Sequence, residues 1–197
     1  MKIEVQAKNL IKHLKDEDKR IKAIMRRVMK RTIDQGWTET SRQLRAEYYL
    51  KNEHIKAGIK KKIDNDNTGR LISSGKPMKF AVDGMTTKTP RWRATQTRKG
   101  IRQYIRRGQR EMFNHAFIAK MPTGHTGVFE RNLEKQQRKV KVYQANKFAY
   151  YKWLPIKELT GPSITALFSL RNRVEKIKQF MTDVFTKRFK HEFDRKN

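Results

Sequence analysis

Between residues 16 and 48, apolar side chains recur at steps of three and four residues. This spacing predicts one long amphipathic helix that buries a single stripe. The acidic residues at its start suit the positive end of the helix dipole. Gly36 costs about 1 kcal/mol in a helix interior, and we expect it to mark a bend. The stripe consists of Ile21, Ile24, Met25, Val28, Ile33, Trp37, Leu44 and Tyr48.

Two further segments show helical spacing. Residues 52–63 carry isoleucine at every fourth position behind Asn52, a residue type favoured at the N-cap, which predicts a second helix. The first helical region therefore spans about 16–63. Residues 162–193 repeat the amphipathic pattern, and Pro162 or Ser163 suits the first turn. The sequence thus predicts long helices towards both ends of the chain.

From about residue 70 to residue 160, the apolar period shortens towards two, and glycines separate the short runs. Such a pattern predicts β-strands arranged as an antiparallel meander. Pro155 keeps residues 154–159 from forming the middle of a helix or of a central strand. The candidate strands are 78–82, 101–106, 111–120, 127–131 and 140–143.

Helices and strands that occupy separate stretches of the chain favour the α+β class. We therefore expect long N-terminal and C-terminal amphipathic helices packed on a small antiparallel β-sheet. For 197 residues the default is a single domain, here spanning 1–197.

Positive charge dominates the composition, with 48 Lys and Arg against 19 Asp and Glu and a formal net charge of +29. Residues 86–110 hold nine basic side chains and no acid. A run of one sign repels itself, so we expect a protruding strand pair or loop, the basic arm, that meets DNA or an acidic protein. A solvated hairpin without a partner is the alternative. The candidate interface or DNA-facing residues are Arg91, Arg93, Arg98, Lys99, Arg102, Arg106, Arg107 and Arg110.

Two aromatic residues lie among these cations. Trp92 stands between Arg91 and Arg93, and Tyr104 lies close to Arg102. Aromatic and arginine residues interleaved in this way can stack on nucleic-acid bases. The same pattern is also the ordinary alternation of a strand with one core face, and both interpretations stay open.

Motifs that would carry catalysis or bind a metal are incomplete. Cysteine is absent, which excludes thiolate catalysis and Cys-based zinc sites. Five residues separate Gly69 from Gly75, where a phosphate-binding loop needs four. The five histidines show no metal-ligand spacing. We predict no enzyme, no cofactor and no metal. Apolar runs are too short for a membrane partner or a signal peptide.

Three blocks of the sequence, taken in order, resemble the bacteriophage minor tail protein Z family, the tail-completion proteins of long-tailed phages. The first block comprises residues 41–56 (SRQLRAEYYLKNEHIK) and 72–77 (ISSGKP). The second comprises 116–119 (AFIA) and 124–131 (GHTGVFER), and the third is 154–163 (LPIKELTGPS). The sequence departs from the family pattern at 132–151, a stretch rich in Lys and Gln that separates the second and third blocks.

The resemblance implies a structural virion protein that completes the head-proximal end of a phage tail and connects it to the head. Implied partners are further copies of the chain in a hexameric ring, tail terminator or tube proteins, and head-completion proteins of the neck. Nonspecific contact with phage DNA is also expected. The chain would be made in the host cytoplasm and end in the virion. The family-like segment is expected at a subunit interface through Leu154, Pro155, Ile156, Leu159, Gly161 and Pro162.

A cellular nucleic-acid-binding protein is the alternative function, because the net charge of +29 supports it. Preference for one base sequence or one RNA structure would favour that alternative. Co-purification with assembled tails would favour the tail-completion role.

Overall fold

The computed structural model describes residues 2–6, 18–64, 68–82, 91–109, 111–122, 124–131, 138–144, 147–153, 156–170 and 172–195. For 2–6, 18–20, 138–144 and 147–153 it describes the backbone alone. The chain forms two compact units. The first unit comprises Met1–Pro77 and Pro162–Asn197, and the second comprises Met78–Gly161. The mixed α+β class predicted from the sequence is confirmed.

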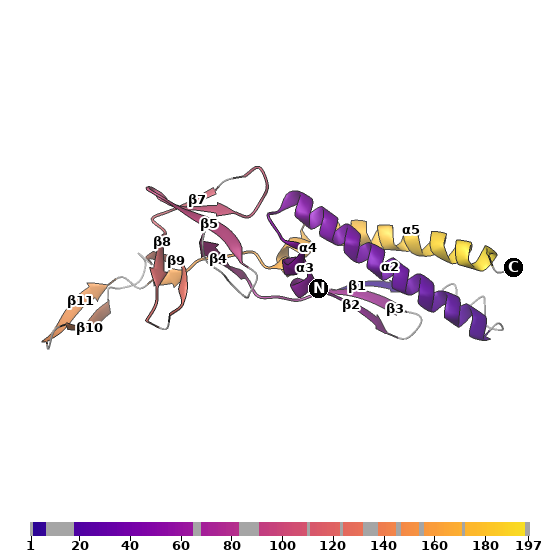
Figure 1. The fold of residues 1–197 in the computed structure, drawn as a ribbon, viewed down its shortest axis with the longest axis horizontal. Helices are drawn as coiled ribbons and strands as arrows, with labels where there is room; N and C mark the ends of the chain where they lie inside the picture. The colour runs from indigo at the N-terminus through magenta and orange to yellow at the C-terminus, as the bar shows by residue number, and fades with distance from the viewer. Residues whose placement is uncertain are drawn as a thin grey trace. The chain divides into compact units, whose positions relative to one another are not determined.

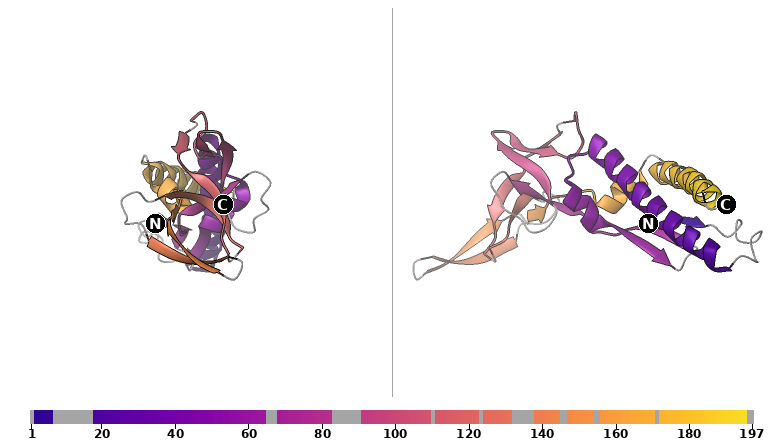
Figure 2. Two further views of the ribbon diagram at one scale, coloured as in Figure 1. Left: turned by 90° about the vertical axis from the view of Figure 1, so that its left-hand side faces the viewer. Right: turned by 45° about the vertical axis from the view of Figure 1, so that its right-hand side comes forward.

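The first unit is built on two long helices that lie side by side above a three-stranded sheet (Figures 1 and 2). They run antiparallel, because Gly36 of one meets Met181 of the other while Glu47 meets Arg173. The sheet has the order β1-β3-β2, and both pairs are antiparallel. The elements are α2 (Asp18–Glu47), α5 (Arg173–Asp194), β1 (Lys2–Gln6), β2 (Ile59–Asp64) and β3 (Thr68–Ser73).

The predicted long helix is present as α2, uninterrupted from Asp18 to Glu47. Seven of the eight predicted stripe residues are buried, including Tyr48 just beyond the end of α2, while Trp37 is half-buried. Gly36 serves close packing, and α2 continues through it. A Cβ built on Gly36 would lie 2.6 Å from Sδ of Met181 on α5. Glycine therefore lets the two helices approach each other at this point.

The predicted second helix, 52–63, is wrong in its second half. Helix α3 (Asn52–Gly58) ends at Gly58, and Ile59 begins β2. Gly58 has no room for a side chain, since a Cβ would lie 2.7 Å from Cβ of Ile164. Isoleucines four residues apart share a face in a strand as well as in a helix, so the spacing alone did not distinguish the two.

The predicted C-terminal helix consists of two helices. Helix α4 (Ile164–Ser169) begins at Ser163, whose side chain accepts a hydrogen bond from the Ala166 amide at 3.1 Å. The chain then turns at Asn172, which has a left-handed conformation with φ of 53°. Asparagine is one of the few residue types that adopt this region readily. Helix α5 follows directly.

The described residues of the second unit form three sheets. The five-stranded sheet has the order β13-β4-β5-β6-β7, the three-stranded sheet β12-β9-β8, and the third is the pair β10-β11. All of these pairs are antiparallel except β4–β5, which is parallel. The strands are β4 (Met78–Val82), β5 (Trp92–Thr97), β6 (Gly100–Tyr104), β7 (Glu111–Asn114), β8 (Phe117–Lys120), β9 (Thr126–Arg131), β10 (Arg138–Gln144), β11 (Lys147–Trp153), β12 (Ile156–Glu158) and β13 (Thr160–Gly161).

Most predicted strands of this unit are confirmed, with one division. The predicted strand 78–82 coincides with β4. The predicted strand 127–131 lies within β9, and the predicted strand 140–143 lies within β10. The predicted strand 111–120 is two strands, because His115 has a positive φ of 65° and the chain turns there. None of the helices in the described ranges combines the length and the apolar character that a membrane crossing requires.

Candidate functional site

The described part of the basic segment forms the inner strands of the five-stranded sheet. Strand β5 lies between β4 and β6, and β6 lies between β5 and β7. The strand pair predicted for this segment is therefore present, joined by a short turn at Arg98 and Lys99. Residues 92–104 do not form a separate arm, since both strands are integrated in the sheet.

One face of the β5–β6 pair belongs to the core. Trp92, Ala94 and Ile101 are fully buried on it, and Gln103, directly opposite Ala94, is 5% exposed. The stacking interpretation of Trp92 is thus wrong, because a buried indole cannot receive a base. The alternation of a strand with one core face explains this residue.

The opposite face of the same strands is polar and open. We call it the basic sheet face and define it by Lys79, Arg93, Thr95, Arg102 and Tyr104. Arg93 stands directly opposite Tyr104, and Thr95 stands opposite Arg102. The guanidinium carbon of Arg93 lies 5.2 Å from the centroid of the Tyr104 ring, a cation–π contact that orients this side chain.

The neighbours of Tyr104 on this face lower its pKa from the ordinary value. The first cause is a hydrogen bond with Thr95, followed by a hydrogen bond with Arg102 and by the charges of Arg102 and Arg93. Partial desolvation acts in the opposite direction. Nearby cations favour the ionised phenolate, so Arg102 and Arg93 act in the same direction as the Thr95 hydrogen bond.

The eight predicted basic residues are not one patch. Arg93 and Arg102 lie on the basic sheet face, while the exposed Arg98 and Lys99 form the turn at one end of it. Arg106 and Arg107 follow β6 at its other end. A guanidinium nitrogen of the half-buried Arg91 lies 3.4 Å from the Thr126 carbonyl oxygen, and Arg110 is outside the described residues.

A carboxylate borders this face beside Lys79. Oε2 of Glu158 lies 2.6 Å from Nζ of Lys79, and its Oε1 lies 2.7 Å from Nε2 of His125. Desolvation raises the pKa of Glu158, but the hydrogen bonds and charges of Lys79 and His125 outweigh it, so the pKa is lowered overall. Glu158 stays ionised and neutralises Lys79. The sequence showed no sign of this cluster, because Lys79 lies on β4, Glu158 on β12 and His125 in the turn before β9.

The family-like segment 154–163 links two sheets of the second unit. Ile156–Glu158 pairs with β9, and Thr160–Gly161 pairs with β4. Between them, Leu159 is 9% exposed and donates its amide to the Val128 carbonyl at 2.8 Å. A Cβ on Gly161 would lie 2.5 Å from Cδ1 of Trp92, so only glycine fits.

This placement corrects part of the predicted subunit interface. Leu159 and Gly161 are buried within the chain and are not available to a neighbouring subunit. Ile156 is 40% exposed and Pro162 is half-buried, whereas Leu154 and Pro155 lie outside the described residues. The Leu-x-Gly pattern of this segment therefore serves packing inside the second unit.

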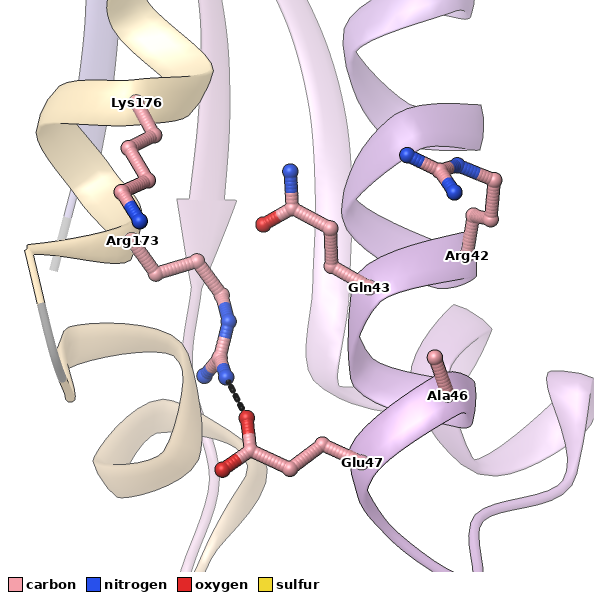
Figure 3. Close-up of a pocket in the computed structure, with 6 residues that line it drawn as sticks. All are labelled: Arg42, Gln43, Ala46, Glu47, Arg173 and Lys176. Atoms are coloured by element: carbon pink, nitrogen blue, oxygen red, sulfur yellow. Dashed lines mark hydrogen bonds and ion pairs between the residues drawn. The ribbon is translucent and has the colours of Figure 1, made fainter.

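A hollow of 480 Å³ lies between the end of α2 and the start of α5 in the first unit (Figure 3). Two of its cations are already paired, Arg42 with Glu39 at 2.7 Å and Arg173 with Glu47 at 2.5 Å. Its lining residues are Arg42, Gln43, Ala46, Glu47, Arg173 and Lys176. The hollow therefore contains a structural ion pair between two helices, which the sequence analysis did not predict.

Comparisons of the chain with protein-family models, with curated proteins and with solved structures gave no match. Within the described residues, no group of three or more His, Asp and Glu side chains is arranged to hold a metal ion. The basic sheet face is the arrangement whose charges and geometry most directly favour a binding role.

Proposed function

We propose that this chain is a structural virion protein that completes the head-proximal end of a phage tail and connects it to the head or neck. The order of the three family-like blocks supports this role. The observation that carries it is the basic sheet face, where Arg93 and Arg102 are displayed on inner strands of a sheet whose other face is core. A rigid, charged surface of this kind suits docking.

In this role the chain acts as one protomer of a ring, expected to be hexameric, between tail terminator or tube proteins and the head-completion proteins of the neck. A ring contact joins two different surfaces of adjacent copies. The two units offer such a difference, since the first presents long helices and the second presents open sheets.

Electron microscopy of tails that carry a tagged copy of the chain tests the location. The label is expected at the end of the tail that joins the head. A label at the distal tip, or a chain that does not co-purify with tails, would overturn the proposal. An untagged tail preparation controls for nonspecific labelling.

Charge reversal tests the docking surface within the same role. Arg102→Glu combined with Arg106→Glu and Arg107→Glu is expected to leave tails that assemble but do not join filled heads. The matched control reverses the exposed Lys176, Lys178 and Lys187 on α5, in the first unit. If tails of the Arg variant join filled heads as efficiently as wild-type tails do, the basic segment takes no part in docking.

The alternative, a cellular nucleic-acid-binding protein, keeps one supporting observation, the placement of Arg93 and Arg102 on one open face of the sheet. The burial of Trp92 removes one of the two aromatic residues that base stacking required. Saturable preference for one base sequence or RNA structure would select this alternative.

A further inference from the structure

We propose that the hairpin formed by β10 and β11 docks on an acidic protein through one of its two faces. The two strands pair antiparallel and stay in register from Arg138 opposite Trp153 to Gln144 opposite Lys147. The inference goes beyond the tail-completion role and rests on it for the complex in which the partner is present.

The register assigns every residue of the hairpin to one of two faces. Residues that stand directly opposite each other in an antiparallel pair share a face, and neighbours along a strand alternate between faces. One face, the apolar hairpin face, consists of Val140, Val142, Ala149, Tyr151 and Trp153. Arg138 lies at one end of this face and Lys147 at the other. The opposite face carries three lysines among three aromatic residues.

The pair forms a sheet of its own. In the described part of the chain no third strand pairs with β10 or β11, and the extensive contacts of each strand are with the other. A two-stranded hairpin alone is marginally stable in water, and it is stabilised when its apolar face packs against another element. A surface supplied by another molecule therefore suits the apolar hairpin face.

The arrangement of residue types favours a protein with carboxylates as that molecule. A protein–protein interface has an apolar centre enriched in aromatic side chains, surrounded by a polar rim. Val140, Val142 and Tyr151 take the place of the centre, and Arg138 and Lys147 take the place of the rim. The two strands hold five basic residues and no acid. The complementary surface has an apolar centre with carboxylates around it.

A second copy of the chain is a poor source of those carboxylates. The chain has a net charge of +29, and like charges across an interface are unfavourable. Most carboxylates among the described side chains already form ion pairs within their own chain, as Glu158 does with Lys79 and Glu192 with Arg31. A different protein is therefore the favoured partner.

Nucleic acids and membranes fit the hairpin less well. Phosphates of a duplex could meet the cations, but they offer nothing apolar to cover Val140 and Val142. Bases of a single strand stack on aromatic rings, whereas these two valines occupy the middle of β10 on the apolar hairpin face. The outer edges of the pair have no strand partner among the described residues, and unpaired backbone edges are excluded from hydrocarbon.

Hydrogen–deuterium exchange of the full chain, free and in isolated tails, tests the inference. In the free chain, the amides of 138–144 and 147–153 are expected to exchange much faster than those of β5 and β6. A partner present at about 100 times its dissociation constant should slow hairpin exchange about a hundredfold, because exchange requires the hairpin to open. This slowing is the result expected in tails.

Two neighbouring tyrosines provide matched variants. Tyr151 belongs to the apolar hairpin face and Tyr150 to the opposite face of the same strand. Threonine is a good strand former, so Tyr151→Thr should lose the slowing in tails while Tyr150→Thr retains it. Equal behaviour of the two variants would contradict docking through one face. Thermal unfolding of each full-chain variant confirms that it is folded.

Charge reversal tests the acidity of the partner. Arg138→Glu with Lys147→Glu should also lose the slowing in tails, because the cations at the ends of the face would become acids. Lys178→Glu with Lys187→Glu makes the same change in charge at exposed positions on α5 and should retain it. Unchanged slowing in the Arg138 and Lys147 variant would rule out an acidic partner.

Cross-linking in tails identifies what covers the face. A photoreactive phenylalanine in place of Tyr151 is expected to cross-link to an acidic segment of a different protein. A cross-link to a second copy would overturn the inference. So would slow hairpin exchange in the free chain, since its own residues would then cover the face. A short DNA duplex or phosphatidylglycerol vesicles that slow exchange as much as tails do would also overturn it.

The tail-completion role and this inference fail in different ways. A chain that is absent from tails would refute the role and, with it, the inference. A chain that is present in tails but whose hairpin exchanges as fast as in the free chain would refute the inference alone.

Discussion

Arg173 at the start of α5 and Glu47 at the end of α2 form an ion pair, with Nη2 2.5 Å from Oε2 (Figure 3). The same guanidinium donates to the Leu167 carbonyl of α4 and lies 5.7 Å from the centroid of the Tyr48 ring. The side chain of Arg173 is 6% exposed and that of Glu47 is 21% exposed. One arginine therefore connects α2 to α4 and α5, which are more than one hundred residues away in the sequence.

Removing this arginine is expected to destabilise the first unit. Arg173→Met leaves Glu47 partly buried without its cation, and breaking a buried pair in this way costs about 3–5 kcal/mol. Urea unfolding followed by far-UV circular dichroism measures the loss, since the long helices dominate the signal. Lys178→Met, at an exposed position on α5, is the control and should change stability by less than about 0.5 kcal/mol. Equal stability of the two variants would contradict the role assigned to Arg173.

A second contact between these helices predicts a pH dependence. Glu192 on α5 is 2% exposed, and its Oε1 lies 2.7 Å from the Arg31 guanidinium on α2. Burial raises the pKa of Glu192, but Arg195, Arg31 and Arg27 lower it, and the net direction is downward from 4.5. A lowered folded-state pKa contributes stability above the unfolded-state pKa, and this is lost as the pH falls through the folded value.

Glu192→Gln is therefore expected to lower the melting temperature most at neutral pH. The difference from the wild type should shrink as the pH falls below the unfolded-state pKa, and it should be lost as the pH falls through the lowered folded-state pKa of Glu192. Thermal unfolding at several pH values measures it. A difference that stays constant down to strongly acid pH would show that charge on Glu192 contributes nothing to the helix pair.

Gly161 predicts a steric effect in the second unit. In Gly161→Ala, the new methyl group would lie 2.5 Å from the Trp92 ring, which is fully buried. Overpacking of this kind costs about 1–3 kcal/mol. Gly75→Ala, where no atom lies within 4 Å of the new Cβ, should be neutral or slightly stabilising. Unfolding followed by tryptophan fluorescence distinguishes them, and equal effects would reject the proposed clash.

Gly36 predicts a stability change whose sign depends on its neighbour. In an isolated helix, Gly36→Ala would gain about 1 kcal/mol from helix propensity. In the folded chain the methyl group meets Met181, so we expect a net loss of about 1 kcal/mol. In the background of Met181→Ala, the same substitution should become stabilising. A double-mutant cycle measures this coupling, and strict additivity would contradict it.

Local periodicity predicted the parts of the fold that depend on neighbouring residues. The three- and four-residue spacing gave α2 to within two residues at its start, and alternation placed β4 correctly. It failed at Gly58, where α3 ends, and at Asn172, the N-cap of α5, where the single predicted helix is divided. At Gly58 the cause is Ile164, more than one hundred residues away, and no local pattern contains that information.

The candidate site likewise has features that the sequence determines and features that only the tertiary structure decides. The sequence by itself determined that cations cluster between residues 86 and 110 and that Arg and aromatic residues alternate there. Only the tertiary structure decided that Trp92 is core and that Arg93 and Tyr104 share the open face. It also decided that Leu159 and Gly161 pack internally, and that Arg173 and Glu192 hold α5 to α2. The physical reason is that burial and ion pairing depend on which distant strands and helices become neighbours, whereas periodicity and charge are properties of consecutive residues.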